Sequence, residues 1–348
     1  MGFKVLIEPF NVCIAPDVGE TILERALNDG VDYPFACQQG QCGSCKSLLL
    51  EGEVEMGRLY NPLACSDEER SRGMILACQS VPLTDCRVAV VEIGGEIVHA
   101  VRELDCEVSE VERPARDIAV VRMKIVSGGP YNFVAGQYAM VTYAGMPARE
   151  YSMANRHDQA MLEFHVRRIE GGAVSEYVHA TLQPGDHVAA RGPFGSAYLH
   201  DEHLGPILAV AGSTGLAPML SIIESALAIG MRQPMHLYFG VRDEADVYCR
   251  DRLDALAAGY PNLRVTVLLS EATRQNIVND ARFRLGRLDT IIAQNFAALS
   301  GFRAYIAGPP AMCEAVTVLL GKLGLPQDRI LADLFYTQAE RPNEVVAP

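Results

Sequence analysis

The sequence predicts a multidomain protein of mixed α+β and α/β class, with a small β-rich unit, an antiparallel β-barrel and a parallel α/β sheet in that order. The chain has 348 residues, which is too long for one comfortable core. Strand patterns follow one another closely in its middle, as in an antiparallel barrel. Later, strands alternate with helices, which indicates a parallel sheet with right-handed crossovers. We expect the first unit at 1–95, a linker at 96–102, the barrel at 103–202 and the α/β domain at 203–348.

The first unit is expected to begin with a β-hairpin and to contain one helix. Residues 4–8 and 12–15 flank a turn and form the hairpin. Thr21 and Glu24 have the spacing of a capping box, so a helix should begin there and end near 28–30. Further strands are expected at 47–50 and 87–93.

Three cysteines of this unit have the spacing Cys-x4-Cys-x2-Cys, and a fourth follows after 32 intervening residues. This is the plant-type pattern for holding a [2Fe–2S] cluster by four thiolates. Gly40 and Gly43 lie between the ligands, where glycine allows unusual φ angles and turns N–H groups toward the sulfides. The predicted ligands are Cys37, Cys42, Cys45 and Cys78.

A structural zinc site and chance clustering are the alternatives for this array. Zinc sites usually pair two Cys-x2-Cys units, and Cys78 has no such neighbour. Cys65 is the rival for the fourth ligand, but its spacing from Cys45 is short. The remaining cysteines are interpreted as small buried apolar residues: Cys13, Cys65, Cys86, Cys106, Cys249 and Cys313.

The net charge of −13 argues against nucleic-acid binding, which requires a basic surface. Residues 1–95 contain 14 acidic and 7 basic residues. An acidic redox module predicts a partner with a basic patch, and a simply solvated acidic surface is the alternative.

No membrane association is expected, and the predicted location is the cytoplasm. The first residues lack the apolar run of a signal peptide. Residues 204–223 carry no charge over 20 positions, the length of a membrane span. They include Gly205-Pro206 and the turn at 212–215, so a strand, a turn and a helix are predicted instead.

Two motifs of the predicted barrel suit a flavin dinucleotide. Arg149-Glu-Tyr151-Ser152 follows one strand pattern, and His165-Val166-Arg167 ends another. Gly171-Gly172 then begins a helix over Ala173, Val174 and Ser175, and the N–H groups at a helix start bind phosphate well. Two arginines near such a helix suit a pyrophosphate, while an aromatic ring can cover a flavin face. A strand with alternating exposed and buried residues is the alternative for the first motif.

Barrel strands are expected at 118–126, 137–143, 151–154, 161–167 and 187–191.

The α/β region contains two turns that suit a nicotinamide dinucleotide. Gly212-Ser213-Thr214-Gly215 lies between a strand and a helix, which implies dinucleotide binding. It is not the G-x-G-x-x-G fingerprint, so a generic Rossmann dehydrogenase is a poor match. The second turn contains Gly308-Pro309, and each turn alone could be a simple connection. Strands are expected at 207–211, 235–241, 263–269, 304–307 and 330–333.

In this order, the motifs resemble the three-domain NADH reductases of bacterial multicomponent oxygenases, in particular the naphthalene dioxygenase reductase group. The resemblance covers nearly the whole chain. Its matching segments are the cluster loop, residues 76–81, 149–152, 171–172, 192–195, 215–218, 238–242 and 308–310.

The resemblance implies a β-grasp ferredoxin domain, a β-barrel that binds FAD and an α/β domain that binds NAD(P). Arg149 and Arg167 would pair with FAD phosphates, Tyr151 would pack on the flavin, and Ser152 would lie near flavin N5. Phe335 or Tyr336 would shield the flavin or the nicotinamide. The implied catalytic set is Tyr151, Ser152 and Phe335. The implied cofactor-binding set is Arg149, Tyr151, Ser152, His165, Val166, Arg167, Gly171, Gly172, Ala173, Val174, Ser175, Gly212, Ser213, Thr214, Gly215, Arg242, Gly308, Pro309, Phe335 and Tyr336.

The implied activity is electron transfer from NADH through FAD and the [2Fe–2S] cluster. The acceptor would be a Rieske-type ferredoxin or the terminal oxygenase of an aromatic ring-hydroxylating dioxygenase, and a monomer would suffice. Many relatives have Cys where this chain has Ala307, so altered alignment or rate of hydride transfer is expected. Asp243 and Glu244 favour NADH over NADPH, while Arg242 favours the reverse.

Three other functions remain open at the level of sequence. The same modules could serve a di-iron monooxygenase of phenols, toluenes or alkanes, or a sugar-deoxygenation system. The cluster could also be a redox sensor in a regulatory binding module. Two nucleotide-site patterns in one chain fit this last alternative poorly.

Overall fold

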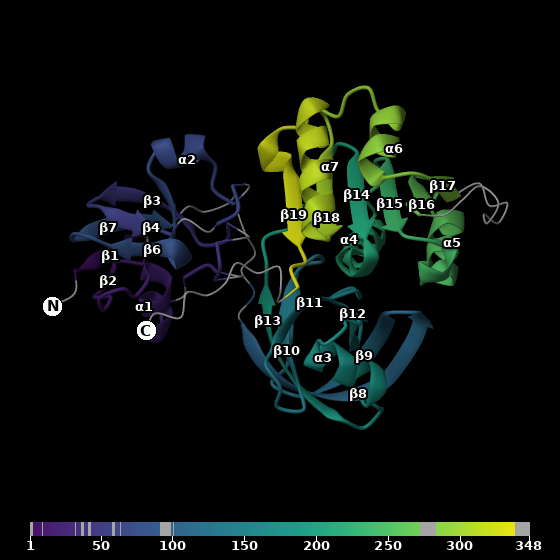
Figure 1. The fold of residues 1–348 in the computed structure, drawn as a ribbon, viewed down its shortest axis with the longest axis horizontal. Helices are drawn as coiled ribbons and strands as arrows, with labels where there is room; N and C mark the ends of the chain where they lie inside the picture. Colours follow the sequence, from purple (N-terminus) through teal and green to yellow (C-terminus); the bar gives the residue numbers. More distant parts are fainter. Residues whose placement is uncertain are drawn as a thin grey trace. The chain divides into compact units, whose positions relative to one another are not determined.

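The computed structural model describes the chain except residues 1, 2, 9, 32, 36, 37, 41, 42, 58, 59, 63, 91–98, 100, 272–282 and 338–348. The chain divides into two compact units, which are described separately (Figure 1). The first comprises residues 1–98 with 194–196. The second comprises 99–193 and 197–341.

The first unit is a β-grasp fold around a five-stranded mixed sheet of order β2-β1-β7-β3-β5. Strand β1 pairs in parallel with β7 and antiparallel with β2. Helix α1 packs its buried Ile22, Leu23 and Ala26 against this sheet, and the predicted capping box of Thr21 and Glu24 is confirmed. The elements are β1 Val5–Glu8, β2 Val12–Ile14, α1 Ile22–Asn28, β3 Lys46–Glu51, β4 Val54–Met56, α2 Asp67–Ser71, β5 Met74–Leu76, β6 Ser80–Pro82 and β7 Cys86–Val90.

Four short elements lie in the acidic stretch between β3 and β7 where the sequence indicates no regular structure. Strands β4, β5 and β6 have three residues each, which is too short for hydrophobic alternation to be recognised. Helix α2 has no buried residue, and its capping box of Ser66 and Glu69 is the local signal for it.

The second unit begins with a six-stranded antiparallel barrel of order β11-β10-β13-β8-β9-β12. A bridge between Met153 and Phe164 joins the two ends of this order and closes the barrel. The elements are β8 Arg102–Ala115, β9 Ile118–Ser127, β10 Tyr138–Tyr143, β11 Arg149–Ser152, β12 Met161–Arg167, α3 Ala173–Ala180 and β13 His187–Phe194.

Strand β8 is the main barrel element that the sequence pattern does not predict. Its 14 residues include five acidic ones, which have low strand propensity. Leu104, Cys106 and Val108 alternate toward the core, and the strand pairs with both β9 and β13. Neighbouring strands therefore stabilise a segment that is weak by itself.

The rest of the second unit is a six-stranded parallel sheet of order β17-β16-β15-β14-β18-β19. The order reverses direction between β14 and β18, and ligands of such sheets bind at this point. The elements are β14 Ile207–Gly212, α4 Leu216–Ala228, β15 Met235–Val241, α5 Arg250–Gly259, β16 Leu263–Leu269, β17 Phe283–Leu285, α6 Leu288–Asn295, β18 Arg303–Gly308, α7 Pro310–Lys322 and β19 Ile330–Leu334.

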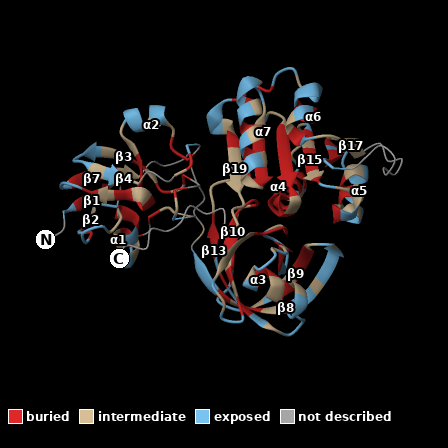
Figure 2. Cartoon of the chain, viewed as in Figure 1, coloured by how far each residue is buried: buried red, intermediate tan, exposed pale blue. Residues whose placement is uncertain are grey.

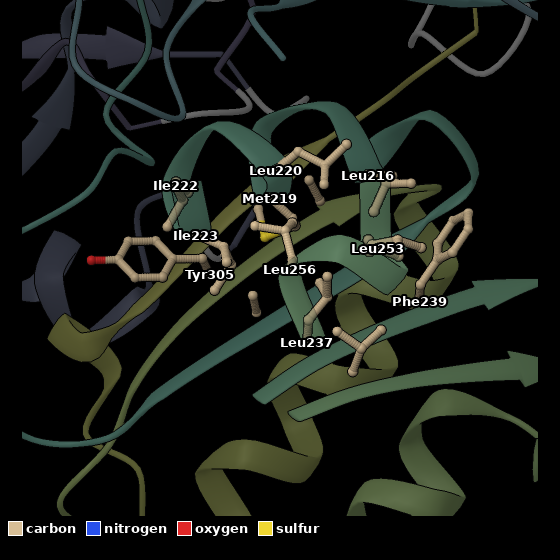
Figure 3. Close-up of a cluster of buried hydrophobic side chains, with 14 of the residues drawn as sticks. Leu216, Met219, Leu220, Ile222, Ile223, Leu237, Phe239, Leu253, Leu256 and Tyr305 are labelled. Atoms are coloured by element: carbon tan, nitrogen blue, oxygen red, sulfur yellow. The ribbon is translucent and has the colours of Figure 1, made fainter. Parts of the chain in front are cut away.

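Helices cover both faces of this sheet. Helices α4 and α5 share one core with it, and α6 and α7 share the other. Figure 3 shows the first core, where Leu216 and Leu220 of α4 lie near Leu253 of α5. All six residues of β14 are buried, and the strands of the sheet are largely buried in Figure 2. The uncharged stretch at 204–223 therefore forms β14, a turn and most of α4, as predicted. Within the described part of the chain, every helix is too short or too polar to cross a membrane.

Candidate functional site

The described part of the cysteine array consists of Cys45 and Cys78, both of which are buried. The N–H of Gly40 donates to Cys78 Sγ at 3.2 Å, and the N–H of Cys78 donates to Cys45 Sγ at 3.5 Å. Such N–H···S contacts stabilise thiolates and suit cluster ligands. The other two predicted ligands, Cys37 and Cys42, lie outside the described residues.

Two glycines of the loop have the backbone conformation expected from the sequence. Gly40 and Gly43 have φ angles of +72° and +77°. A Cβ at Gly40 would lie 2.7 Å from Cβ of Tyr60 and 2.9 Å from Cγ of Gln79. Both the conformation and the space at Gly40 therefore require glycine.

Cys65 has surroundings unlike those of Cys78. Its thiol faces the carbonyl of Met74 at 3.8 Å, and burial raises its pKa. A raised pKa disfavours the thiolate that a metal needs. This contrast favours Cys78 as the fourth ligand.

The flavin motif of the barrel lies on β11. Tyr151 packs edge-on between Tyr143 and Phe164, with ring centroids 6.1 and 6.5 Å away. The next residue, Ser152, is buried and donates a hydrogen bond to Asp333 Oδ2 at 3.2 Å. Asp333 pairs with Ala307 across strands β19 and β18, so this bond joins the barrel to β19, the neighbour of the strand that precedes the second glycine-containing turn.

Sequence reasoning assigned no role to Asp333. The feature of the sequence that could have indicated a role is a carboxylate within the otherwise apolar strand β19, two residues before Phe335. The N–H of Phe335 donates to Gly308 O at 2.9 Å, which holds the C-terminal segment beside the same turn.

The start of helix α3 fits a phosphate. Its N-cap residue is Gly172, and the cap has no side-chain hydrogen bond. The N–H groups of the first turn are therefore not capped by a side chain and can bind an anion. A Cβ at Gly172 would lie 2.9 Å from Ser175 Oγ and 3.0 Å from Ile169 O. Ser175 itself accepts a hydrogen bond from the Ile169 N–H at 3.0 Å, which stabilises the loop.

The two arginines expected at the FAD phosphates lie in different surroundings. Arg149 donates to the carbonyl of Ala148 at 2.9 Å. Arg167 donates to Asp117 Oδ2 at 3.1 Å and lines the pocket described next. A role for either arginine at FAD stays a prediction.

A pocket of about 390 Å³ lies at the carboxyl ends of β14, β15, β16 and β18. Five of the predicted cofactor-binding residues line it, namely Arg167, Gly212, Ser213, Arg242 and Pro309. This is the position that the switch in strand order predicts for a ligand. Its size falls in the range of small-molecule and cofactor sites.

Close backbone packing joins the two glycine-containing turns. A Cβ at Gly308 would lie 2.8 Å from Gly212 O, and a Cβ at Gly215 would collide with Ala307 O. Ser213 has a left-handed backbone with φ of +52°, which is uncommon for a residue other than glycine. The surrounding packing stabilises this conformation.

Carboxylates pair with the arginines that line the pocket. Arg242 donates to Asp246 Oδ2 at 2.9 Å and to Asp117 Oδ2 at 3.1 Å, and Arg287 donates to Asp289 at 3.2 Å. Burial tends to raise the pKa of Asp246, but hydrogen bonds from Arg242 and Arg116 hold it below its usual value. These carboxylates are not Asp243 and Glu244, the pair that was expected from the sequence to favour NADH.

Asp243 and Glu244 face other arginines. Asp243 accepts from Arg116 at 2.7 Å, and Glu244 accepts from Arg250 at 3.2 Å. The negative charge lining the pocket therefore comes from Asp117, Asp246 and Asp289.

His165 lies in a buried polar cluster between the barrel and the α/β sheet. Its side chain is fully buried, with Nδ1 2.9 Å from the Tyr248 hydroxyl and Nε2 3.2 Å from Glu163 Oε1. Burial lowers the pKa of His165, although Glu163 opposes this effect. Glu163 also accepts hydrogen bonds from Arg122 and Arg252, each at 2.7 Å. The predicted contact of His165 and Val166 with FAD is not tested by this arrangement.

Three family models match consecutive parts of the chain. A 2Fe-2S iron-sulfur cluster binding domain matches residues 5–83, an oxidoreductase FAD-binding domain matches 105–198, and an oxidoreductase NAD-binding domain matches 209–317. The three kinds of site described above fall within these matches in the same order.

Known proteins are similar over nearly the whole chain. The ferredoxin–NAD(P)(+) reductase component of the naphthalene 1,2-dioxygenase/salicylate 5-hydroxylase systems of Ralstonia sp. is 38% identical, covering 96% of this chain and 98% of its own. The reductase component DmpP of phenol 2-monooxygenase from Pseudomonas sp. (strain CF600) is 33% identical, covering 99% and 97%. The crystal structure of the Amycolatopsis cytochrome P450 reductase GcoB has a TM-score of 0.76 at 35% identity, covering 96% and 98%.

Proposed function

Because the chain belongs to the family of ferredoxin–NAD(P)(+) reductase components of oxygenase systems, we propose that it transfers electrons from NADH to a Rieske-type ferredoxin or to the terminal oxygenase of an aromatic ring-hydroxylating dioxygenase. The chain is an oxidoreductase with FAD-binding, NAD-binding and [2Fe–2S] domains. The identity of the acceptor, a monomeric state and a cytoplasmic location are parts of the proposal.

The hydrogen bond between Ser152 and Asp333 is the observation that carries the proposal. It joins the barrel strand with the flavin motif to the sheet strand beside Gly308. A flavin held along β11 and a nicotinamide held at the end of β18 would thus share one junction. Such proximity is what hydride transfer between two cofactors requires.

The residues of this chain bind and align the cofactors, and none has to act as a nucleophile. When bound, FAD would supply the conversion of a hydride donor's electron pair into single electrons, and a [2Fe–2S] cluster held by the cysteines would supply a one-electron carrier. Tyr151 packs where it can cover a flavin ring, and the first turn of α3 offers N–H groups to phosphate. Ala307 lies fully buried in β18 next to the turn, so no thiol occupies this position of the chain.

NADH is the proposed electron donor, and the charge at the pocket supports this choice. Arg242 is bonded to Asp246 and Asp117, and Arg287 is bonded to Asp289. The 2′-phosphate of NADPH would have to compete with these carboxylates for the arginines. The 2′-hydroxyl of NADH requires no such displacement.

A di-iron monooxygenase is the second candidate acceptor. The similarity to the reductase of phenol 2-monooxygenase extends over 99% of the chain at 33% identity. Reconstituted turnover would distinguish the two. Purified protein with NADH would support hydroxylation by a Rieske dioxygenase system under the first proposal and by a phenol hydroxylase under the second.

Anaerobic titration with NADH tests the proposed internal electron transfer. We expect the flavin and cluster absorptions to bleach together and low-temperature EPR to show a reduced [2Fe–2S] signal. Flavin bleaching with a silent cluster would contradict electron export through the four cysteines. Absence of any response to NADH or NADPH would refute the reductase function.

A further inference from the structure

The Tyr248 hydroxyl lies between two hydrogen-bonding partners. It is 2.9 Å from Nδ1 of His165 and 3.4 Å from the carbonyl oxygen of Ser213. Tyr248 and Ser213 both line the nucleotide pocket. Ser213 has a left-handed backbone, with φ of +52°.

A phenol has one proton to donate, so the two partners compete for it. Nε2 of His165 faces the carboxylate of Glu163, which also accepts hydrogen bonds from two arginines. Because a carboxylate is an acceptor, its position favours a proton on Nε2. In neutral His165, Nδ1 is then an acceptor and receives the Tyr248 proton. When His165 is protonated, Nδ1–H donates to the Tyr248 oxygen, and the phenolic proton is available to Ser213.

We propose that Tyr248 and His165 are positioning residues of the nucleotide site, and that protonation of His165 transfers the Tyr248 hydrogen bond to the Ser213 carbonyl. The bond then stabilises the left-handed Ser213 backbone and the turn that borders the dinucleotide. This inference rests on the proposed use of the pocket by a nicotinamide dinucleotide.

The charged groups around His165 come from three elements. Glu163 on β12 favours protonation, whereas Arg252 on α5 and Arg122 on β9 oppose it. Tyr248 packs edge-on against the ring at 5.2 Å and faces Asp117 and Cys249 electrostatically. Since burial is the largest effect and lowers the pKa of His165, the neutral form predominates at neutral pH, and the switch operates on acidification.

Equilibrium binding of NAD⁺ to the full-length holoprotein tests the proposal without turnover. Isothermal calorimetry would follow the dissociation constant from about pH 8 to about pH 5. For the unmodified protein we expect affinity to rise about three- to tenfold on acidification, the effect of one hydrogen bond. Tyr248→Phe keeps the ring and removes the hydroxyl, so its affinity should stay near the alkaline value of the unmodified protein.

Tyr238→Phe is the matched control. Tyr238 is equally buried, and its hydroxyl accepts a hydrogen bond from Asn295 at 2.8 Å on the opposite face of the sheet. This variant should keep the full pH dependence. Thermal unfolding and flavin content of each variant would verify that it is folded.

Two results would overturn the inference while leaving the proposed function intact. They are NAD⁺ binding that is independent of pH in the unmodified protein, and an equal pH dependence in Tyr248→Phe. Absence of binding by NAD⁺ and of reduction by NADH would instead refute the proposed function.

Discussion

At the scale of single residues, the buried cysteines differ in what their sulfur atoms contact. Cys78 Sγ accepts the N–H of Gly40, whereas the Cys65 thiol faces a carbonyl. A cluster ligand accepts such N–H groups, whereas a thiol that faces a carbonyl can only donate to it. Burial alone therefore does not identify the ligand.

Replacing Cys78 should remove the cluster. We expect Cys78→Ser to lose most of its bound iron and its [2Fe–2S] absorption, because a serine hydroxyl replaces a ligating thiolate. Iron analysis and visible spectroscopy would measure this. The matched variant Cys65→Ser should retain the cluster, and loss of iron from Cys65→Ser alone would reverse the ligand assignment.

Replacing Asp333 should slow flavin reduction. Ser152 donates to a carboxylate, and hydrogen bonds to charged groups are stronger than neutral ones. In Asp333→Asn, we expect the rate of flavin reduction by NADH to fall about tenfold, equivalent to about 1.4 kcal/mol. Stopped-flow absorbance would measure the rate. The exposed Asp328 provides a control through Asp328→Asn, and equal rates in both variants would exclude a role for the Ser152–Asp333 bond.

Replacing Asp117 should relax the choice of nucleotide. Its carboxylate bonds both Arg242 and Arg167 at the pocket. Asp117→Asn leaves these cations less neutralised, so the KM for NADPH should fall roughly three- to tenfold while the KM for NADH changes little. Steady-state reduction of ferricyanide with each nucleotide would show this. The exposed Asp251 on α5 is a suitable control, and the idea fails if Asp117→Asn and Asp251→Asn have the same NADPH preference.

At the scale of elements, helix α3 depends on a glycine at its start. A Cβ at Gly172 would be too close to Ser175 Oγ and Ile169 O, so the loop before the helix would have to shift. We expect Gly172→Ala to weaken FAD binding about fivefold, as a displacement cost of about 1 kcal/mol implies. Flavin release measured by fluorescence would test this.

Gly259 provides the control for this substitution. A Cβ there would meet nothing within 4 Å, and Gly259 ends α5. Gly259→Ala should leave FAD affinity unchanged. If Gly172→Ala also binds FAD normally, the first turn of α3 is not the phosphate site.

The elements that were predicted correctly are those with strong local patterns. Strands β15 and β16 agree with the expected ranges 235–241 and 263–269 because buried parallel strands are largely apolar runs. Strand β8 was not predicted, because its acidic residues hide the alternation of Leu104, Cys106 and Val108. Strand β17 has three residues and is paired to β16, which no local pattern of that length reveals.

At the scale of the whole molecule, electrons should be able to leave the flavin without the cluster. The two units have separate cores, and the ferredoxin match ends at residue 83 while the FAD match begins at residue 105. We therefore expect Cys78→Ser to reduce ferricyanide with NADH at close to the normal rate but to fail with a protein acceptor such as a Rieske ferredoxin. Parallel assays with the two acceptors would show this, and loss of both activities would indicate that the cluster is needed for the flavin site itself.

The sequence by itself determined the order of domains, the plant-type cysteine spacing and the location of both glycine-containing turns. These features are local, because each depends on residues within one loop or on the periodicity of one element. The glycines of the cluster loop and of the start of α3 are also local features of this kind.

The tertiary structure alone decided which side chains meet. Ser152 and Asp333 are 181 residues apart, and His165 and Tyr248 are 83 apart. Asp117, in the turn between β8 and β9, lines the pocket, and no local pattern indicates this position. Such contacts arise from packing a barrel against a parallel sheet, and periodicity within a segment carries no information about a partner in another domain.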